Sequence, residues 1–242
     1  MDLEGRTVVV TGGTRGLGRA VAHAMADAGA VVVAAARNLP EPTPDGDRRI
    51  AAVEADVTVP ASVDALMKTV NARYGGPHVV VANAGVSRPG PVAGLSDDHW
   101  AAVVDTNLTG VFHTVRAAVP YLRDAGGGRI ITVSSILGRR AMPGAAAYCA
   151  SKAALERFTE VCALELAADD ITVNCLAPGF IDEGQGRALM ADERLWPRLS
   201  ATLATGRPGT GADVGAAAVF LASASSGYVN GAVLPVDGAV RW

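Results

Sequence analysis

Residues 6–29 read RTVVVTGGTRGLGRAVAHAMADAG, which is an apolar run, a cluster of glycines and a helix-like stretch in that order. Residues 6–11 are mostly β-branched and are followed by two glycines, so they predict a buried strand. Residues 16–28 have helical periodicity, and Gly29 suits the position just past a helix end. A buried strand that turns through glycines into a helix is the opening unit of a layered α/β fold.

The same alternation continues along the chain. Residues 96–123 predict a helix with a break near Gly110, and residues 38–48, rich in proline, aspartate and glycine, predict a loop. Alternating strands and helices predict a doubly wound parallel sheet with helices on both faces. The other predicted strands are 30–36, 50–55, 78–82, 129–134, 171–176 and 233–236, and the other predicted helices are 61–74 and 148–168.

Length and composition narrow the class of protein. The chain has 242 residues, half of them hydrophobic, and shows no repeat and no dividing linker, which predicts one domain over 1–242. Residues 182–210 are the least regular stretch and predict a flexible flap beside the site. The net charge is −3 with no basic run, which argues against nucleic-acid binding. No apolar run could span a bilayer and no signal peptide is evident, so we expect a cytoplasmic protein that binds no membrane.

Cysteine and histidine usage gives no sign of a disulfide framework or a metal site. Cys149, Cys162 and Cys175 form no C-x-x-C pair, and their odd number favours free thiols. The four histidines are scattered, and no two have metal-ligand spacing. We therefore predict no bound metal.

The glycines between the first strand and the first helix predict a phosphate site. Gly12, Gly16 and Gly18 follow the spacing G-x-x-x-G-x-G. Missing side chains allow a tight turn and the close approach of a pyrophosphate, while the helix amino terminus offers free N–H groups. A sharp turn alone could also explain the glycines, but their place between a strand and a helix favours a dinucleotide.

The end of the second strand bears on which dinucleotide binds. Enzymes that use NAD tend to carry an acid there, which binds the ribose 2′-hydroxyl. Residues 34–36 are all alanine and are followed by Arg37, which could pair with a 2′-phosphate, with Arg15 closing from the other side. The alternative is that both are ordinary surface arginines. We favour NADP(H) over NAD(H).

Three further residues predict a reacting centre. Tyr148 and Lys152 lie four apart at the start of a predicted helix and share one face. A nearby ammonium stabilises a phenolate, so we expect Lys152 to lower the pKa of Tyr148. Ser135 lies at the end of the fifth predicted strand, and strand carboxyl ends form the ligand crevice of such sheets.

With these residues in place, the chain resembles the short-chain dehydrogenase/reductase family, in the single-domain form typified by 3-oxoacyl-[acyl-carrier-protein] reductases. The resemblance implies a three-layer Rossmann fold with a seven-stranded parallel sheet in the order 3-2-1-4-5-6-7. The matching motifs run almost from end to end. They are Thr11-Gly12…Gly16-Leu17-Gly18, Asp56-Val57, Asn83-Ala84-Gly85, Asn107, Ser134-Ser135, Tyr148 to Lys152, Pro178-Gly179, Tyr228 to Gly231 and Val236-Asp237-Gly238.

The resemblance also implies roles for the reacting residues. Tyr148 would be the general acid in reduction and the base in oxidation, Lys152 would tune Tyr148 and bind the nicotinamide ribose, and Ser135 would polarise the carbonyl. Asn107 would hold a water that links Lys152 to solvent. The implied catalytic set is Asn107, Ser135, Tyr148 and Lys152. The implied cofactor-binding set is Gly12, Thr14, Arg15, Gly16, Leu17, Gly18, Arg37, Asp56, Val57, Asn83, Ala84, Gly85, Tyr148, Lys152, Pro178, Gly179 and Ile181.

Within the cofactor set the resemblance is more specific. Asp56 would accept from the adenine amino group, Asn83 and Gly85 would line the adenosine ribose, and the Ile181 N–H would reach the carboxamide. Structural readings stay open: Asn107 could bind backbone at a helix irregularity, Asp56 could be a loop residue at a strand end, and residues 83–85 could form a structural turn. The family often has a threonine near position 183 whose side chain helps to hold the carboxamide. This chain has Asp182-Glu183 instead, which puts that side-chain contact in doubt.

The implied function is transfer of a hydride between NADP(H) and a ketone or secondary alcohol, with a 3-oxoacyl thioester or a natural-product ketone among the candidates. Arg139 and Arg140 could border the site and favour an anionic substrate, or lie in a solvated loop. Two alternatives are a non-catalytic NADP-binding regulator, and an imine reductase or epimerase on the same fold. Family analogy suggests a homotetramer or homodimer.

Overall fold

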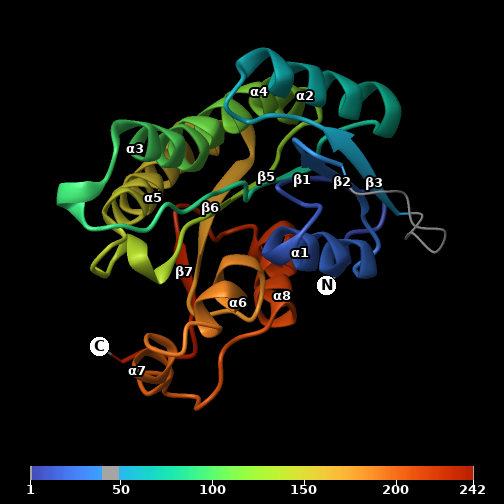
Figure 1. The fold of residues 1–242 in the computed structure, drawn as a ribbon. Helices are drawn as coiled ribbons and strands as arrows, with labels where there is room; N and C mark the ends of the chain where they lie inside the picture. Colours follow the sequence, from blue (N-terminus) through green and yellow to red (C-terminus); the bar gives the residue numbers. More distant parts are fainter. Residues whose placement is uncertain (1, 40–48, 242) are drawn as a thin grey trace.

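The computed structural model describes residues 2–39 and 49–241 and contains a seven-stranded, all-parallel sheet. The strand order β3-β2-β1-β4-β5-β6-β7 confirms the expected order (Figure 1). The predicted loop at 38–48 lies mostly outside the described residues. The strands are β1 (Thr7–Thr11), β2 (Val31–Ala36), β3 (Ile50–Glu54), β4 (Val79–Ala82), β5 (Gly128–Val133), β6 (Ile171–Pro178) and β7 (Val233–Val236).

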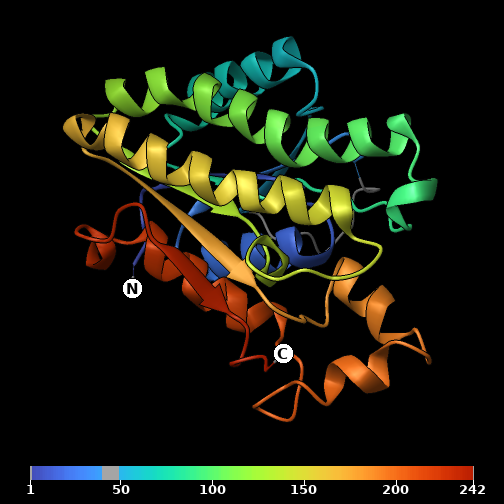
Figure 2. The same ribbon diagram turned by 90° about the vertical axis from the view of Figure 1, so that its left-hand side faces the viewer.

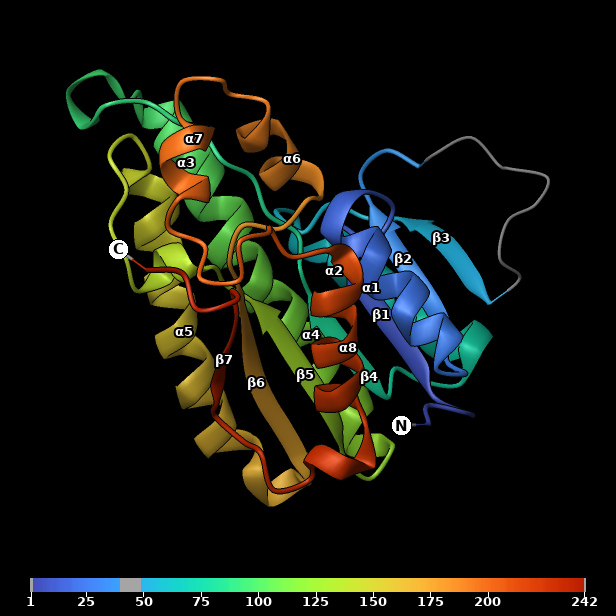
Figure 3. The same ribbon diagram turned by 90° about the horizontal axis from the view of Figure 1, so that it is seen from below.

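Helices cover both faces of the sheet, as Figures 1 and 3 show. Alternate strand residues face opposite layers: Val9 packs with α2, α4 and α5, whereas its neighbours Val8 and Val10 pack with α1 and α8. All three valines are fully buried, which is why β-branched runs mark these strands so clearly. The helices are α1 (Gly16–Asp27), α2 (Pro60–Tyr74), α3 (Asp97–Val104), α4 (Gly110–Asp124), α5 (Ala146–Leu166), α6 (Gly184–Met190), α7 (Trp196–Ser200) and α8 (Gly211–Ala222).

The predicted break near Gly110 is a turn of π-helix over Asp105–Thr109, inserted between α3 and α4. The extra residue in such a turn re-aims the side chains that it carries. Asn107 lies at its centre and is fully buried. The break in the helix therefore places the amide of Asn107 in the interior.

The sequence analysis missed α8. Seven of its twelve residues are buried, and nine are glycine, alanine or valine, so no clear amphipathic stripe marks it. Its start does carry a readable signal, because Thr210 and Asp213 form a reciprocal capping box. The short helices α6 and α7 were also missed, inside the stretch expected to be irregular.

In the part of the chain that the structure describes, no helix is both long enough and apolar enough to cross a membrane.

Candidate active site

A cleft of about 940 Å³ opens at the carboxyl ends of the strands, on both sides of the point where the strand order reverses between β1 and β4. Crevices at such reversals are the usual ligand sites of open α/β sheets. Every predicted site residue lines this cleft except Asn107. The lining residues absent from the prediction include Arg19, Val86, Thr106 and most of the stretch from Glu183 to Ala191.

The glycine turn is tightly built at one wall of the cleft. Gly12 has φ +66° and Gly16 has φ +52°, conformations that favour glycine. A Cβ on Gly18 would lie 2.1 Å from the Gly12 carbonyl oxygen, so no side chain fits there. The turn can therefore bring its backbone close to a ligand at the start of α1.

Asn83 supports this turn from β4. Its Nδ2 donates to the Thr11 carbonyl oxygen at 2.9 Å, and its backbone N donates to the Thr11 hydroxyl at 3.1 Å. Ala84 N donates to the same hydroxyl at 3.2 Å. The side chain predicted to line a ribose thus holds the glycine turn in place, which is the structural role that the sequence left open.

Charged groups gather at the end of β2. Arg37, Arg15 and Arg19 line the cleft together with Asp56. Asp56 Oδ1 accepts from the Thr58 backbone N at 2.9 Å and from its hydroxyl at 2.7 Å. Burial alone would raise the pKa of Asp56, but the Thr58 hydrogen bonds and the charge on Arg37 outweigh it and keep that pKa below its usual value.

The reacting residues come from β5 and α5. Ser135 follows β5, and its hydroxyl caps a short 3-10 turn by accepting from Leu137 N at 3.2 Å. Tyr148 is in the first turn of α5, and Lys152 lies one turn further, 3% exposed. Lys152 Nζ donates to the Val133 carbonyl oxygen at 2.6 Å and lies 5.6 Å from the centre of the Tyr148 ring.

The expected lowering of the Tyr148 pKa is not found. Burial raises this pKa, and a hydrogen bond with Ser135 offsets the rise only in part. The Lys152 ammonium is turned toward Val133, and burial lowers its own pKa to about 8. Near neutral pH the site therefore holds a protonated phenol beside a lysine that is close to losing its charge.

Asn107 connects the loop after β4 with helix α5, behind the cleft. Its Oδ1 accepts from Val86 N at 2.8 Å, while Nδ2 donates to Val86 O at 3.0 Å and to Ser151 Oγ at 3.2 Å. A Cβ on Gly85 would lie 3.4 Å from Asn107 Oδ1 and 3.6 Å from Lys152 Nζ, so the three groups are close neighbours. Asn107 thus fixes the segment after β4 against α5.

Comparison with known proteins agrees with this arrangement. A family model described as enoyl-(acyl carrier protein) reductase matches residues 12–240. The 3-oxoacyl-[acyl-carrier-protein] reductase FabG of Escherichia coli strain K12 is 35% identical over 246 residues, covering 98% of each chain. The chain belongs to the short-chain dehydrogenase/reductase family. It is therefore an oxidoreductase of that family.

Solved structures of short-chain dehydrogenases superpose closely on this chain. A protein described as an NAD(P)-dependent gluconate 5-dehydrogenase of Beutenbergia cavernae, with bound NADP, has a TM-score of 0.91 and 36% identity, covering 98% of this chain and 97% of that one. A 2-deoxy-D-gluconate 3-dehydrogenase of Agrobacterium tumefaciens, also described with bound NADP, has a TM-score of 0.89 and 35% identity, covering 98% and 96%.

In this short-chain dehydrogenase, residues 182–209 form a closed excursion from the end of β6. The excursion starts and finishes at one place, because Asp182 N donates to Gly209 O at 2.8 Å and Gly209 N donates to Phe180 O at 2.9 Å. Its first helix, α6, meets the glycine turn: a Cβ on Gly16 would lie 3.1 Å from the Gly184 Cα. Most of residues 183–191 line the cleft, so the start of the stretch predicted as a flap lies at the site.

The two arginines after Ser135 do not line the cleft. Arg139 Nε donates to Glu156 at 2.8 Å, and Arg140 Nη2 donates to the Val240 carbonyl oxygen at 3.3 Å. Neither therefore supports the suggestion of an anionic substrate.

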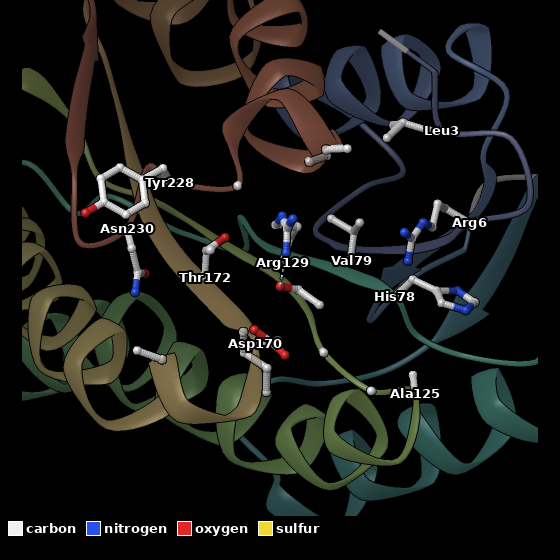
Figure 4. Close-up of a pocket in the computed structure, with 18 of the residues that line it drawn as sticks. Leu3, Arg6, His78, Val79, Ala125, Arg129, Asp170, Thr172, Tyr228 and Asn230 are labelled. Carbon is white, nitrogen blue, oxygen red and sulfur yellow. Dashed lines mark hydrogen bonds between the residues drawn. The ribbon is translucent and has the colours of Figure 1, made fainter.

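A second cavity, of about 900 Å³, lies at the opposite end of the sheet (Figure 4). Its lining includes Arg6, His78, Arg129, Thr172 and the fully exposed Tyr228, and none of the predicted site residues. Among the described residues, no group of three or more histidine, cysteine, aspartate or glutamate side chains is placed to hold a metal.

Proposed function

We propose that this protein is an NADP(H)-dependent oxidoreductase that transfers a hydride between the nicotinamide and a ketone or secondary alcohol. One observation carries the proposal: Ser135, Tyr148 and Lys152 share a single cleft with the glycine turn and Arg37. Proton-transfer groups and a phosphate-binding turn are both needed for such a reaction, and each type is rare at random in one crevice. The intact set of three favours catalysis over a purely regulatory role.

The cleft fits a dinucleotide. Gly12, Gly16 and Gly18 leave the backbone bare at the start of α1, where a pyrophosphate is stabilised by N–H groups and the helix dipole. Arg37 and Arg15 would bind a 2′-phosphate by charge-assisted hydrogen bonds, and Asp56 would accept from the adenine. Pro178, Gly179 and Ile181 would line the nicotinamide end. Two structural neighbours described with bound NADP support the phosphate-bearing form.

When bound, the nicotinamide supplies or accepts the hydride. In the reductive direction Ser135 and Tyr148 donate hydrogen bonds to the carbonyl oxygen, where negative charge develops. Tyr148 then gives its proton to that oxygen. Lys152 keeps two N–H donors beyond the one bound to Val133, and these would orient the ribose.

The protonation state of the site favours reduction near neutral pH. Burial keeps the pKa of Tyr148 above its ordinary value, so the phenol is protonated and ready to act as an acid. Oxidation needs the phenolate as base, which forms only at higher pH. We therefore propose carbonyl reduction as the faster direction near neutral pH.

A 3-oxoacyl thioester or a natural-product ketone is the substrate class that we propose. Tyr148 packs against a buried apolar cluster that joins the 182–209 segment to the loop after β5. The buried residues of this cluster do not line the cleft themselves but hold Tyr148 and the loop after β5 in place. The 35% identity to FabG supports the same substrate class. The cluster is Ile136, Leu137, Ala145, Phe180, Leu199, Leu203 and Val240.

The outer face of α4 and α5 supports self-association. The two helices run side by side (Figure 2), and the Phe112 and Phe158 rings meet edge to face at 6.4 Å. Phe112, Val161 and Leu164 expose 40%, 44% and 83% of their surface there, which a second copy would cover. We propose a homodimer or homotetramer through this face, to be tested by light scattering of the wild type and of Leu164→Glu.

The test of the proposed function is a titration with NADPH and NADH, followed by energy transfer from the three tryptophans. We expect tighter binding of NADPH, lost in Arg37→Ala and kept in Arg6→Ala, which removes an arginine from the opposite cavity. Ketones are then screened with NADPH. Equal affinity for NADPH and NADH would refute the proposed role of Arg37. Failure to bind either dinucleotide would refute the proposed oxidoreductase function.

A further inference from the structure

A buried carboxylate that the proposed mechanism does not use lies directly behind the reacting residues. Glu156 is on α5, one turn after Lys152 and two turns after Tyr148, and is 7% exposed. Carboxylates are rarely buried to this degree unless they are paired. Its partners therefore indicate what it holds.

Both oxygens of Glu156 are bound by the segment that carries Ser135. Oε1 accepts from the Ser134 hydroxyl at 3.0 Å, and Oε2 accepts from Arg139 Nε at 2.8 Å. The Ser134 hydroxyl also lies 3.2 Å from the Lys152 carbonyl oxygen on the same helix. One carboxylate thus ties the residue before Ser135 and the residue four after it to α5.

Gly138 packs tightly against the side chains of Glu156 and Ser134. A Cβ on Gly138 would lie 2.6 Å from Glu156 Oε1 and 2.8 Å from Ser134 Oγ. Bare glycine backbone is therefore the only surface that fits between the segment and the carboxylate. A movement of Glu156 must move the segment with it, because protein interiors transmit small displacements.

We propose that Glu156 is a positioning residue, which sets the place of the Ser135 hydroxyl relative to Tyr148 by fixing residues 134–139 onto α5. This inference rests on the proposed function, in which both hydroxyls must reach one carbonyl oxygen. Ser135 comes from a loop and Tyr148 from a helix, so something must set their separation. A displacement of about 1 Å at a reacting group costs about 100-fold in rate.

The variant that tests the proposal is Glu156→Gln, which keeps the shape and the hydrogen bond with Ser134 but removes the charge that holds Arg139. We expect kcat to fall about 10- to 100-fold with the NADPH Kd unchanged, because the cofactor side of the cleft is untouched. In the oxidative direction the pH–rate profile moves to higher pH, because the phenolate of Tyr148 is the base there and the hydrogen bond of Ser135 holds the Tyr148 pKa down. Glu160→Gln is the matched control: Glu160 is on the same helix but pairs with Arg157 on the surface, so its loss changes neither quantity.

A double-mutant cycle separates positioning from general support of the fold. If Glu156 acts through Ser135, then Glu156→Gln has no further effect on kcat in a Ser135→Ala background, whereas independent effects would multiply. Arg139→Gln and Ser134→Ala, which each remove one half of the tie, replace Glu156→Gln should that variant fail to fold. Wild-type kcat and pH profile in these variants, or multiplicative effects in the cycle, would overturn the proposal.

A readout without turnover keeps this proposal distinct from the proposed function. The chain has four tyrosines, and the ¹³Cζ resonance of Tyr148 is identified by its loss in Tyr148→Phe. We expect Glu156→Gln to shift this resonance and Glu160→Gln to leave it in place. A wild-type protein that turns over no ketone would refute the function alone, while an unmoved resonance would refute the role of Glu156.

Discussion

The two ends of the sheet each carry a cavity of nearly the same size, about 940 Å³ at the carboxyl ends of the strands and about 900 Å³ at the amino ends. The first collects the glycine turn, the charged groups at β2 and the pair Tyr148 and Lys152. The second collects a glycine loop, two arginines and an exposed tyrosine (Figure 4). Their volumes do not distinguish the two cavities. They differ in which ends of the surrounding helices face them.

In a parallel sheet with crossover helices, every such helix begins near the carboxyl ends of the strands and finishes near the amino ends. Helix starts carry partial positive charge and finishes carry partial negative charge. The ends of α4, α5 and α8 approach the second cavity, which suits the cation Arg129 rather than an anionic ligand. Burial, together with the nearby positive charge of Arg6, lowers the pKa of Arg129. This end of the sheet therefore already holds two cations close to each other.

The largest contrast is expected for the two tyrosines. Tyr148→Phe removes the proposed proton donor from the carboxyl-end cleft, so kcat should fall about 100- to 10,000-fold while NADPH still binds. Tyr228→Phe removes a fully exposed hydroxyl beside the other cavity and should leave kcat unchanged. Steady-state ketone reduction measures both, and equal losses would remove the functional distinction between the two ends.

The arginines give the next contrast. Arg37→Asp places an acid where NAD enzymes bind the ribose 2′-hydroxyl, so NADPH affinity should fall about 100-fold and NADH affinity should rise. Arg6→Asp makes the same charge change at the amino-end cavity and should alter neither. Fluorescence titration of both variants reports the two affinities. A loss of NADPH binding in Arg6→Asp would mean that net charge, rather than a local contact, selects the cofactor.

The titration of Lys152 gives a smaller effect, and it belongs to the carboxyl-end cleft alone. Burial lowers the pKa of Lys152 to about 8, so its positive charge is present below that pH and is lost as the pH rises through it. We expect kcat/KM for reduction to be level below pH about 8 and to fall about tenfold per pH unit above it. In Lys152→Arg the charge persists, so this fall should move to higher pH even though the rate is lower. A fall at the same pH in that variant would assign the titration to another group.

The smallest effect concerns stability at the amino-end cavity. Among the described residues, Arg129 Nε and Thr172 Oγ1 are the two buried side-chain polar atoms without a partner, and both residues line this cavity. Thr172→Val removes a hydroxyl that is buried without a hydrogen bond, so it should stabilise the fold by about 1 kcal/mol, or about 2–4 °C in Tm. Thr114→Val, whose hydroxyl donates to Gly110 O at 2.8 Å, should destabilise by a similar amount. Thermal unfolding compares them, and a destabilised Thr172→Val would indicate a partner for that hydroxyl in solution.

The sequence predicts the sheet well because each strand is an apolar, largely β-branched run between turn residues. It fails at α8, where small apolar residues cover every side of the helix and erase the periodicity. It also places the cleft correctly, since strand ends and helix starts follow from the alternation of elements. The contacts of Glu183 and Gln185 with the cleft depend on how the 182–209 segment folds back, and no local pattern encodes that path.

Side-chain direction is the second thing that the sequence could not supply. Asn83 lies where the pattern puts it, yet its amide turns to the glycine loop because two carbonyl oxygens there need a donor. Lys152 is on the expected helix face, but its ammonium turns to the Val133 carbonyl oxygen, and burial governs the pKa of Tyr148. Both outcomes depend on backbone groups that come together only in the folded chain.

The closed excursion at residues 182–209 has an evolutionary consequence. Because it leaves and rejoins the framework at one point beside Gly209, its length and composition can drift without shifting any strand. Mutations that accumulate there would alter what enters the cleft, while the strands that carry the glycine turn and Ser135 keep their places. One scaffold can in this way give rise to enzymes with different substrates, as the names of a 3-oxoacyl-[acyl-carrier-protein] reductase and a gluconate 5-dehydrogenase, both similar to this chain, illustrate.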